Sequence, residues 1–361
     1  MSHTPIIVDT LRLGYNPRLL AAWSIINREA RMETLYQLSI ALTTWLQASY
    51  PQLHGFMSAV SAMGEEEFFL VVLPAIYWSI DKRLGRQLGY FFLLSALINN
   101  ILKNLIRQPR PFWLEPAVKR NDVEGYGMPS GHVQNATVVF MLVAAHFRRA
   151  WVWLVVLMYI LVMAISRIYL GVHFIQDTVT GFLAGLVILG LFVVWQIKLL
   201  SRFNRQILGR RLLVILFAPL ILAVVYISGL LIIGAPNMNV PWASFVPAAE
   251  LDGYKVIVSS LAGLFGFGIG IIMESSRIRF RADGPAWQRV ARYLLGIVVA
   301  LGIWAGLRAV FPTEPLWLAL PFRFLRYLLL LSWVTYFAPW VFVRLRVAQV
   351  DAESEIQVTF P

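Results

Sequence analysis

The chain has no cysteine, and only 14% of its 361 residues are charged. It can therefore form no disulfide, no zinc–thiolate site and no thiol nucleophile. A soluble domain usually carries about 25% charged residues, and about half of it or less is apolar, whereas 59% of this chain is apolar. Folded as one water-soluble globule, such a chain would expose large apolar patches. We therefore expect an all-α, polytopic transmembrane helical bundle.

About nine stretches approach the roughly 20 apolar residues that a spanning helix needs. They lie at 66–81, 87–106, 131–147, 150–169, 177–198, 211–233, 256–274, 290–311 and 317–342. The residues before 65 differ, because their apolar stretch, 35–46, is short and interrupted by polar side chains. This pattern favours an interfacial amphipathic helix over a span. The first thirty residues show no basic, apolar and small-residue cleavage pattern, so we expect no removable signal peptide.

Lysine and arginine outnumber aspartate and glutamate by 31 to 19, and most of them lie in alternate loops. The basic loops are near 82–86, 148–149, 198–211, 277–289 and 344–346. Because cytoplasmic loops carry the excess of basic residues, we expect a cytoplasmic carboxyl end and, with nine spans, an extracytoplasmic amino-terminal segment. No soluble module carries a basic patch with interleaved aromatics, so we expect no nucleic-acid partner.

One loop on the opposite side breaks this charge pattern. The segment 107–132 carries Arg107, Arg110, Lys119 and Arg120 on the side that should be poor in cations. Binding of an anion would explain the cluster, and attraction to lipid headgroups is the alternative.

Lys103 and Arg110 open a first group of polar residues on this side. They are seven positions apart, about two helical turns, so both cations can point to the same place. We expect Pro111 to end the helix and to fix the guanidinium at its mouth.

A second group is Pro129-Ser130-Gly131-His132, where the third span should start. The free amides and positive dipole end of a helix favour an anion there, and a glycine lets the anion approach closely. The third group is Ser166-Arg167, His173 and Asp177, and its Asp177 carboxylate can hold the imidazole of His173 in one tautomer.

Together these groups suit covalent phosphoryl transfer. Lys103, Arg110 and Arg167 supply three positive charges for one compact anion. Two histidines remain, one to accept the phosphoryl group and one to protonate the departing oxygen. The outer loops lack the clustered carboxylates of a magnesium site, so we expect neither a metal nor another cofactor.

The three groups resemble the pattern of the type 2 phosphatidic acid phosphatase superfamily: Lys-x6-Arg-Pro, Pro-Ser-Gly-His, and Ser-Arg-x5-His-x3-Asp. The resemblance covers residues from about 66 to 190. It implies a helical core and a metal-independent phosphatase that acts through a phosphohistidine. By this resemblance His173 is the nucleophile, Asp177 orients it, and His132 is the acid for the leaving oxygen. The residues implied to hold the phosphoryl group are Lys103, Arg110, Ser130, Gly131 and Arg167.

A more distant likeness, in 45–47, 67–69 and 166–174, is to the glucose-6-phosphatase branch, which acts on a soluble sugar phosphate. It supports the topology rather than the substrate. We expect an interfacial segment at 1–64 outside the cytoplasm, a five-span phosphatase core at 65–200, a four-span annex at 201–345 and a cytoplasmic tail at 346–361.

Three arginines stand in or near the outer half of two annex spans: Arg308, Arg323 and Arg326. Intramembrane cations are costly and are usually paired or functional. Pairing with Glu250, Asp252 or Glu314 would brace the bundle, and this is the interpretation we favour. A second contact to an anionic group is the alternative.

The combined pattern predicts an integral membrane enzyme that hydrolyses a phosphate monoester, with a membrane lipid as substrate, since a tail can enter sideways from the bilayer. We expect it in an inner or plasma membrane, with the active site on the extracytoplasmic side. The alternatives are a phosphatase of a soluble sugar phosphate, a lipid phosphotransferase, and a transporter or lipid-binding protein that only holds an anion. The sequence makes no prediction of oligomeric state.

Overall fold

The computed structural model describes residues 17–351, and side chains among them from residue 32 onward. This part of the chain is helical, apart from one isolated antiparallel bridge between Phe280 and Val350. The α-helices are α1 (Pro17–Ser49), α2 (His54–Ala62), α3 (Glu66–Ser79), α4 (Lys82–Ile106), α5 (Pro111–Leu114), α6 (Gly131–Phe147), α7 (Ala150–Tyr169), α8 (Ile175–Val194), α9 (Leu200–Asn204), α10 (Leu208–Ile233), α11 (Val246–Arg277), α12 (Ala286–Val310), α13 (Leu316–Ser332) and α14 (Ala338–Arg344). Short 3-10 helices are η1 (Pro51–Leu53), η2 (Pro116–Val118) and η4 (Ala243–Phe245), and π-helical segments are η3 (Trp195–Leu199) and η5 (Trp333–Phe337). The expected all-α class is confirmed.

Seven helical segments in the described part of the chain are long and apolar enough to cross a membrane. They are Lys82–Leu114, Ala150–Tyr169, Ile175–Asn204, Leu208–Ile233, Ala243–Arg277, Ala286–Val310 and Leu316–Arg344. The helices α3 and α6 form where two further spans were expected, but they have only 14 and 17 residues. A 14-residue helix is roughly 21 Å long, shorter than the ~30 Å hydrocarbon core. The chain is therefore a polytopic bundle with seven helices of spanning length in its described part.

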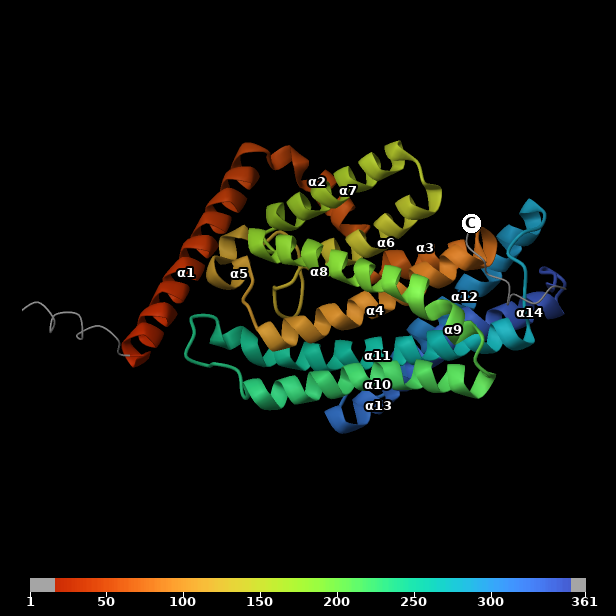
Figure 1. The fold of residues 1–361 in the computed structure, drawn as a ribbon. Coiled ribbons are helices and arrows are strands. Elements are labelled where there is room, and N and C mark those ends of the chain that lie inside the picture. Colours follow the sequence, from red (N-terminus) through yellow and green to blue (C-terminus); the bar gives the residue numbers. More distant parts are fainter. Residues whose placement is uncertain (1–16, 352–361) are drawn as a thin grey trace, which may run out of the picture.

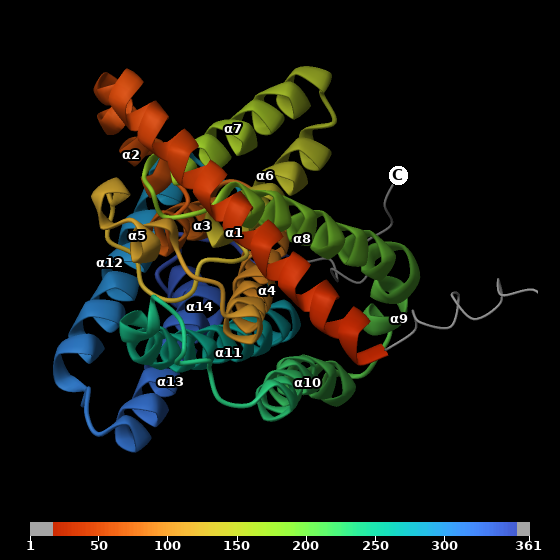
Figure 2. The ribbon, with the colours of Figure 1, turned by 90° about the vertical axis from the view of Figure 1, so that its left-hand side faces the viewer.

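The helix α1 crosses one end of the bundle, while long helices such as α4, α10 and α11 lie side by side (Figure 1). Figure 2 looks onto this end and shows α1 passing in front of the other helices. It packs against α5, η2 and α7, and it buries Tyr36, Ser39 and Thr43. Its Leu38 and Trp45 side chains are instead more than half exposed, at 59% and 54%. Such two-sidedness suits a helix at a membrane interface, and the interfacial assignment stays a prediction.

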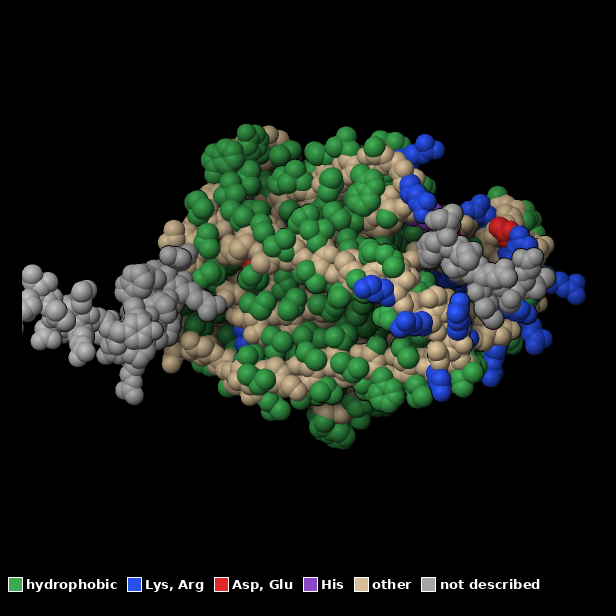
Figure 3. All heavy atoms as spheres, in the orientation of Figure 1, with side chains coloured by type: hydrophobic (Ala, Val, Ile, Leu, Met, Phe, Trp, Pro, Cys, Tyr) green, Lys and Arg blue, Asp and Glu red, His purple; other side chains and the backbone are tan. Residues whose placement is uncertain are grey.

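The two ends of the bundle differ in charge. Lysine and arginine side chains gather at the end opposite α1 (Figure 3), where the connections between α3 and α4, α6 and α7, α9 and α10, and α11 and α12 lie (Figure 1). The connections from α4 to α6 and from α7 to α8 are at the α1 end (Figure 1). These latter connections carry most of the residues expected to bind phosphate.

The annex helices and the core form one packed unit. The helix α11 contacts α4, α10 and α13, and a Cβ added at Gly266 would lie 2.5 Å from the backbone oxygen of Leu328. Glycine is therefore required for α11 and α13 to approach this closely. At the basic end, a buried ion pair of 3.0 Å joins Lys82 Nζ on α4 to Glu274 Oε1 on α11. We conclude that α11 couples the annex to the core along its length.

Candidate active site

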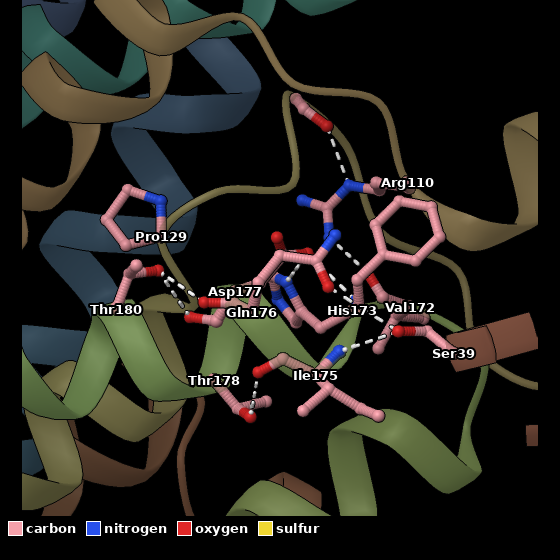
Figure 4. Close-up of polar contacts among 12 residues, drawn as sticks. Ser39, Arg110, Pro129, Val172, His173, Ile175, Gln176, Asp177, Thr178 and Thr180 are labelled. Carbon is pink, nitrogen blue, oxygen red and sulfur yellow. Dashed lines mark hydrogen bonds and ion pairs between the residues drawn. The ribbon is translucent and has the colours of Figure 1, made fainter. Parts of the chain in front are cut away.

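Arg110 lies just beyond the end of α4, and its guanidinium is held by the loop around it. The helix ends at Ile106 with Arg107 in the left-handed conformation, at φ 54°. The expectation that Pro111 ends this helix is therefore wrong, and Pro111 instead begins α5, a position that suits its missing N–H. The Arg110 side chain is buried, and it donates to the carbonyl oxygens of Glu124, Gly125 and Val172 at 2.6, 2.7 and 3.1 Å (Figure 4).

The segment around Ser130 begins α6, as expected. Ser130 is the N-cap residue and Gly131 the first residue of the helix, so free amides face the site here. The amide of Ser130 donates to the backbone oxygen of Asp177 at 2.9 Å, which joins the second group of residues to the third. Within the described chain, Ser130 Oγ and His132 Nε2 are buried and have no hydrogen-bond partner. Both atoms are therefore able to bond to a ligand.

A buried amide network supports this segment, and its residues lie outside the three sequence motifs. Asn99 Nδ2 on α4 donates to the carbonyl of Pro129 at 3.2 Å and to Gln134 Oε1 at 2.9 Å. Gln134 Nε2 in turn donates to the carbonyl of Ser95 at 2.8 Å. A Cβ at position 131 would lie 2.8 Å from Asn99 Oδ1, so only glycine fits against the network. The available signal was the set of polar residues, Ser95, Asn99 and Gln134, inside otherwise apolar helices.

His173 lies in the connection between α7 and α8, and Asp177 lies in the first turn of α8. Asp177 Oδ2 accepts the backbone N–H of Phe174 at 2.9 Å and lies 3.3 Å from His173 Nδ1. Both side chains are buried, at 2% and 1% exposed, and they lie beside Arg110 (Figure 4). Because the carboxylate faces Nδ1, it favours the tautomer with its proton on Nδ1 and leaves Nε2 with a free lone pair. The expected pairing of imidazole and carboxylate is present.

Cations from the first and third groups of residues act on the imidazole of His173. Burial lowers the pKa of His173 well below its usual range, and the charges of Arg110, Arg167 and Lys103 lower it further. The imidazole is therefore neutral at pH 7, the form in which its Nε2 is a nucleophile. All three cations act on this ring although they belong to three segments of the chain.

Arg167, at the end of α7, has few partners in spite of complete burial. Its Nη1 donates to Ser61 Oγ on α2, and its Nε has no partner among the described residues. The neighbouring Ser166 hydroxyl bonds back to the carbonyl of Met163 at 2.8 Å, so Ser166 supports the helix rather than the site. The structure thus brings all eight expected residues to one end of the bundle, and it leaves Ser130, His132 and Arg167 with unused polar atoms.

No group of three or more histidine, cysteine, aspartate or glutamate side chains among the described residues is placed to hold a metal ion. Apart from Asp177, whose carboxylate contacts His173, the polar groups of the site are cations, amides, hydroxyls and imidazoles, which suit an anion.

The annex arginines do not pair as we favoured. Glu250 pairs with Arg107, through a 2.9 Å contact between its Oε1 and Arg107 Nε. Among the described residues, no ion pair within 4 Å joins Arg308, Arg323 or Arg326 to an acidic side chain.

These arginines instead border a cavity of about 540 Å³ between α3, α4 and the annex. Arg323 Nε donates to the carbonyl of Lys255 at 2.9 Å and to Ser259 Oγ at 2.6 Å. Glu124 and Asp252 also line the cavity, and the Glu124 carbonyl accepts from Arg110. The cavity therefore reaches the loop that holds the candidate site.

Comparison with known proteins identifies the family. Residues 84–201 match the family model described as the PAP2 superfamily, and residues 258–350 match the one described as the PAP2 superfamily phosphatase, transmembrane extension. Sphingosine-1-phosphate phosphatase 2 of Mus musculus is 31% identical over 139 residues, which are 36% of this chain and 39% of that protein. Glucose-6-phosphatase 3 of Bos taurus is 25% identical over 345 residues, 86% of this chain and 96% of that protein.

A solved structure, the transmembrane PAP2 type phosphatidylglycerolphosphate phosphatase from Bacillus subtilis, matches with a TM-score of 0.38 and 22% identity. It covers 52% of this chain and 98% of that chain. The chain spans less than two fifths of the length of the sphingosine-1-phosphate phosphatases that it matches.

The helical bundle and the two family matches define an integral membrane protein with a PAP2 core and an added set of carboxyl-terminal helices. The chain belongs to the type 2 phosphatidic acid phosphatase (PAP2) superfamily. All the residues of the three motifs lie within the matched core, 84–201.

Proposed function

We propose that this protein is a membrane phosphatase that hydrolyses a phosphate monoester, with a lipid phosphate as substrate, through a phosphohistidine. The observation that carries the proposal is the buried His173, with Asp177 on its Nδ1 and three cations acting on its ring. A protein that only bound an anion would need the cations but not an oriented, neutral imidazole. The family membership supports the same reaction class.

In the first step, Nε2 of His173 attacks the phosphorus of the monoester and forms a P–N bond as the P–O bond to the alcohol breaks. His132 donates a proton to the departing oxygen. In the second step, water attacks the phosphorus, His132 accepts its proton, and the P–N bond breaks to release inorganic phosphate and neutral His173. Asp177 holds the imidazole and stabilises the positive charge that it gains during attack.

The phosphoryl oxygens are held by the remaining residues of the site. Lys103, Arg110 and Arg167 supply the positive charge that phosphoryl transfer requires on the equatorial oxygens. Ser130 and Gly131 add a hydroxyl and the amides of the first turn of α6. Among the described residues, three of the five N–H groups of Arg110 donate to carbonyls, which leaves two for a phosphoryl oxygen. No metal or other cofactor has a role in this scheme.

The site lies at the α1 end of the bundle, opposite the end at which surface lysine and arginine side chains gather (Figure 3). Because basic loops stay in the cytoplasm, we place the active site on the extracytoplasmic side of an inner or plasma membrane, with the carboxyl end in the cytoplasm. In this arrangement 65–200 is the phosphatase core, 201–345 is the annex, 17–64 lies at the outer interface and 346–351 begins the tail. The rest of the expected segments 1–64 and 346–361 lies outside the described residues.

A lipid substrate is favoured by the position of the site at helix ends, where an apolar tail can enter from the bilayer. The relatives named as sphingosine-1-phosphate phosphatases and as phosphatidylglycerophosphatase B support it. The second candidate is a soluble sugar phosphate. It is favoured by the alignment with glucose-6-phosphatase 3, which extends through the annex.

The test is a hydrolysis assay on purified protein in neutral detergent, with lysophosphatidic acid, sphingoid and prenyl phosphates, phosphatidylglycerophosphate and sugar phosphates. We expect release of inorganic phosphate from at least one lipid and loss of that release in His173→Ala. The matched control is His146→Ala, a histidine at the basic end that is 41% exposed, and it should keep its activity.

Hydrolysis of the sugar phosphates alone would select the second candidate. Transfer of phosphate to an added alcohol in place of water would identify a phosphotransferase. Binding of phosphate esters without any release, or full activity in His173→Ala, would contradict the proposal.

A further inference from the structure

A second large cavity lies at the basic end of the bundle, away from the candidate active site. Its volume is about 700 Å³, within the range of roughly 300–1,000 Å³ that small-molecule pockets occupy. Its walls come from the start of α4, the end of α8 with η3, α9, the start of α10 and the end of α11. We call it the arginine groove. None of the residues of the three phosphatase motifs lines it.

Four arginines from three segments of the chain line the arginine groove: Arg83, Arg86, Arg211 and Arg279. All four are half-buried. No aspartate or glutamate is among its described lining residues. Arg211 on α10 and Arg279 in the connection after α11 line the hollow from different segments, so an anion placed between them is attracted by both. The lysines and arginines around this end are visible in Figure 3.

Arg211 is positioned as a ligand-binding group. Its Nη2 donates to Ser276 Oγ at 3.2 Å, which fixes the plane of the guanidinium against α11. Its Nε is buried and has no hydrogen-bond partner among the described residues. A guanidinium held on one side with donors unused on the other matches the oxygens of a phosphate group.

The remaining walls are apolar and suit hydrocarbon chains. Aromatic and branched residues such as Tyr90, Phe91, Phe192, Trp195 and Ile215 line the groove beside the arginines. A hollow with cations at one edge and hydrocarbon along its length matches the two parts of a phospholipid.

We propose that the arginine groove binds an anionic phospholipid, with its phosphate on the arginines and its acyl chains along the apolar walls. Topogenic charge alone explains an excess of arginine at this end of the bundle. It does not explain why four arginines from three segments surround one hollow with apolar walls. The proposal is independent of the proposed phosphatase reaction, because the groove shares no residue with the active site.

The experiment measures lipid binding to the full-length protein in neutral detergent by native mass spectrometry and by the shift in thermal unfolding temperature. The probes are dioleoyl phosphatidylglycerol, dioleoyl phosphatidylcholine and inorganic phosphate. The test variant is Arg211→Gln/Arg279→Gln. The matched control is Arg205→Gln/Arg210→Gln, which removes the same charge from the same end but alters no groove residue.

We expect wild type and control to bind phosphatidylglycerol in preference to phosphatidylcholine, and the test variant to bind it about tenfold more weakly. Inorganic phosphate should not compete, because it lacks the chains. Equal loss in both double variants would show that general surface charge is responsible, and unchanged binding in the test variant would overturn the proposal. Competition by inorganic phosphate would overturn the lipid assignment. Should the double variant not fold, Arg279→Gln alone must weaken binding in the same direction, or the proposal fails.

Discussion

Arg167 in the core and Arg292 in the annex are both fully buried, at 1% and 0% exposed, but they differ in how many bonds they donate. Arg292 donates four hydrogen bonds, to the backbone oxygens of Arg281, Ala282, Asp283 and Val347. Arg167 donates one, to Ser61, among the described residues. A guanidinium has five N–H groups, so Arg292 is nearly saturated and Arg167 is not.

This difference separates a structural cation from a ligand-binding one. Arg292 links the connection between α11 and α12 to the residues near Val347, which follow α14. Its charge can be buried because four backbone carbonyls accept its hydrogen bonds. Arg167 has no comparable set of partners, and neither do Ser130 Oγ and His132 Nε2 beside it. Among the described residues Arg292 also leaves its Nε without a partner, so the difference lies in the number of bonds, four for Arg292 and one for Arg167. A buried arginine with most of its donors unused, beside other unused polar atoms, is the one we assign to a ligand.

Of the two arginines, Arg167→Gln should have the larger effect on activity. The substitution removes a charge aimed at the phosphoryl oxygens, so kcat/KM should fall by about 10²- to 10³-fold, with little change in thermal unfolding. Steady-state phosphate release and thermal melts in detergent measure the two quantities. Activity within tenfold of wild type would remove Arg167 from the site.

Arg292→Gln should give the opposite result. Loss of its bonds to backbone carbonyls leaves buried acceptors unpaired, and we expect a destabilisation of about 2–4 kcal/mol. The activity per folded molecule should stay within about twofold, because the residue lies far from the site. A catalytic loss without destabilisation would break the comparison between the two arginines.

A smaller effect is expected from Gln134→Met, which removes the amide that links Asn99 to the Ser95 carbonyl. It should cost about 1–3 kcal/mol of stability, and it should lower kcat/KM severalfold because Pro129 and Ser130 lose support. Thr137→Val, one turn further on α6, is the control, since among the described residues its hydroxyl bonds only to the carbonyl of Val133 on the same helix. Equal effects from both substitutions would argue that the network has no positioning role.

The smallest effect is a dependence of stability on pH. The pKa of His173 is lowered by burial and by neighbouring cations, so its folded value lies below the unfolded value of about 6.5. As pH falls below about 6.5 the unfolded chain takes up a proton that the folded chain does not, and the folded state loses up to about 1.4 kcal/mol per pH unit. The thermal unfolding temperature of wild type should therefore fall more steeply than that of His173→Gln as the pH is lowered from 6.5 to 5. Parallel curves would contradict the assignment.

Much of the fold followed from hydrophobic run lengths, because spanning helices have few other ways to satisfy their backbone. One exception has a local cause. The helix α4 ends at Ile106, five residues before Pro111, because Arg107 adopts a left-handed cap. No residue type in this segment predicts that conformation. The helices α3 and α6 match the expected stretches 66–81 and 131–147 closely, so the run lengths predicted their size, and what is not confirmed is that they span the membrane.

The candidate site residues could be named from their motifs, but their supports could not. Hydrogen bonds from Asn99 to Gln134 and from Arg110 to the carbonyls of Glu124 and Gly125 depend on which helix faces pack together. The partners of Arg323 were missed for the same reason, because they are a backbone carbonyl and a serine hydroxyl rather than a carboxylate.

The central claim is that His173 carries the phosphoryl group during turnover. It is tested most directly by mixing the protein with a radiolabelled phosphate monoester that it hydrolyses, quenching at alkaline pH and locating the label by peptide mapping. We predict label on His173, more of it in His132→Ala if the second step is slowed more than the first, and none in His173→Ala. Label on a different residue, or label retained in His173→Ala, would contradict the account.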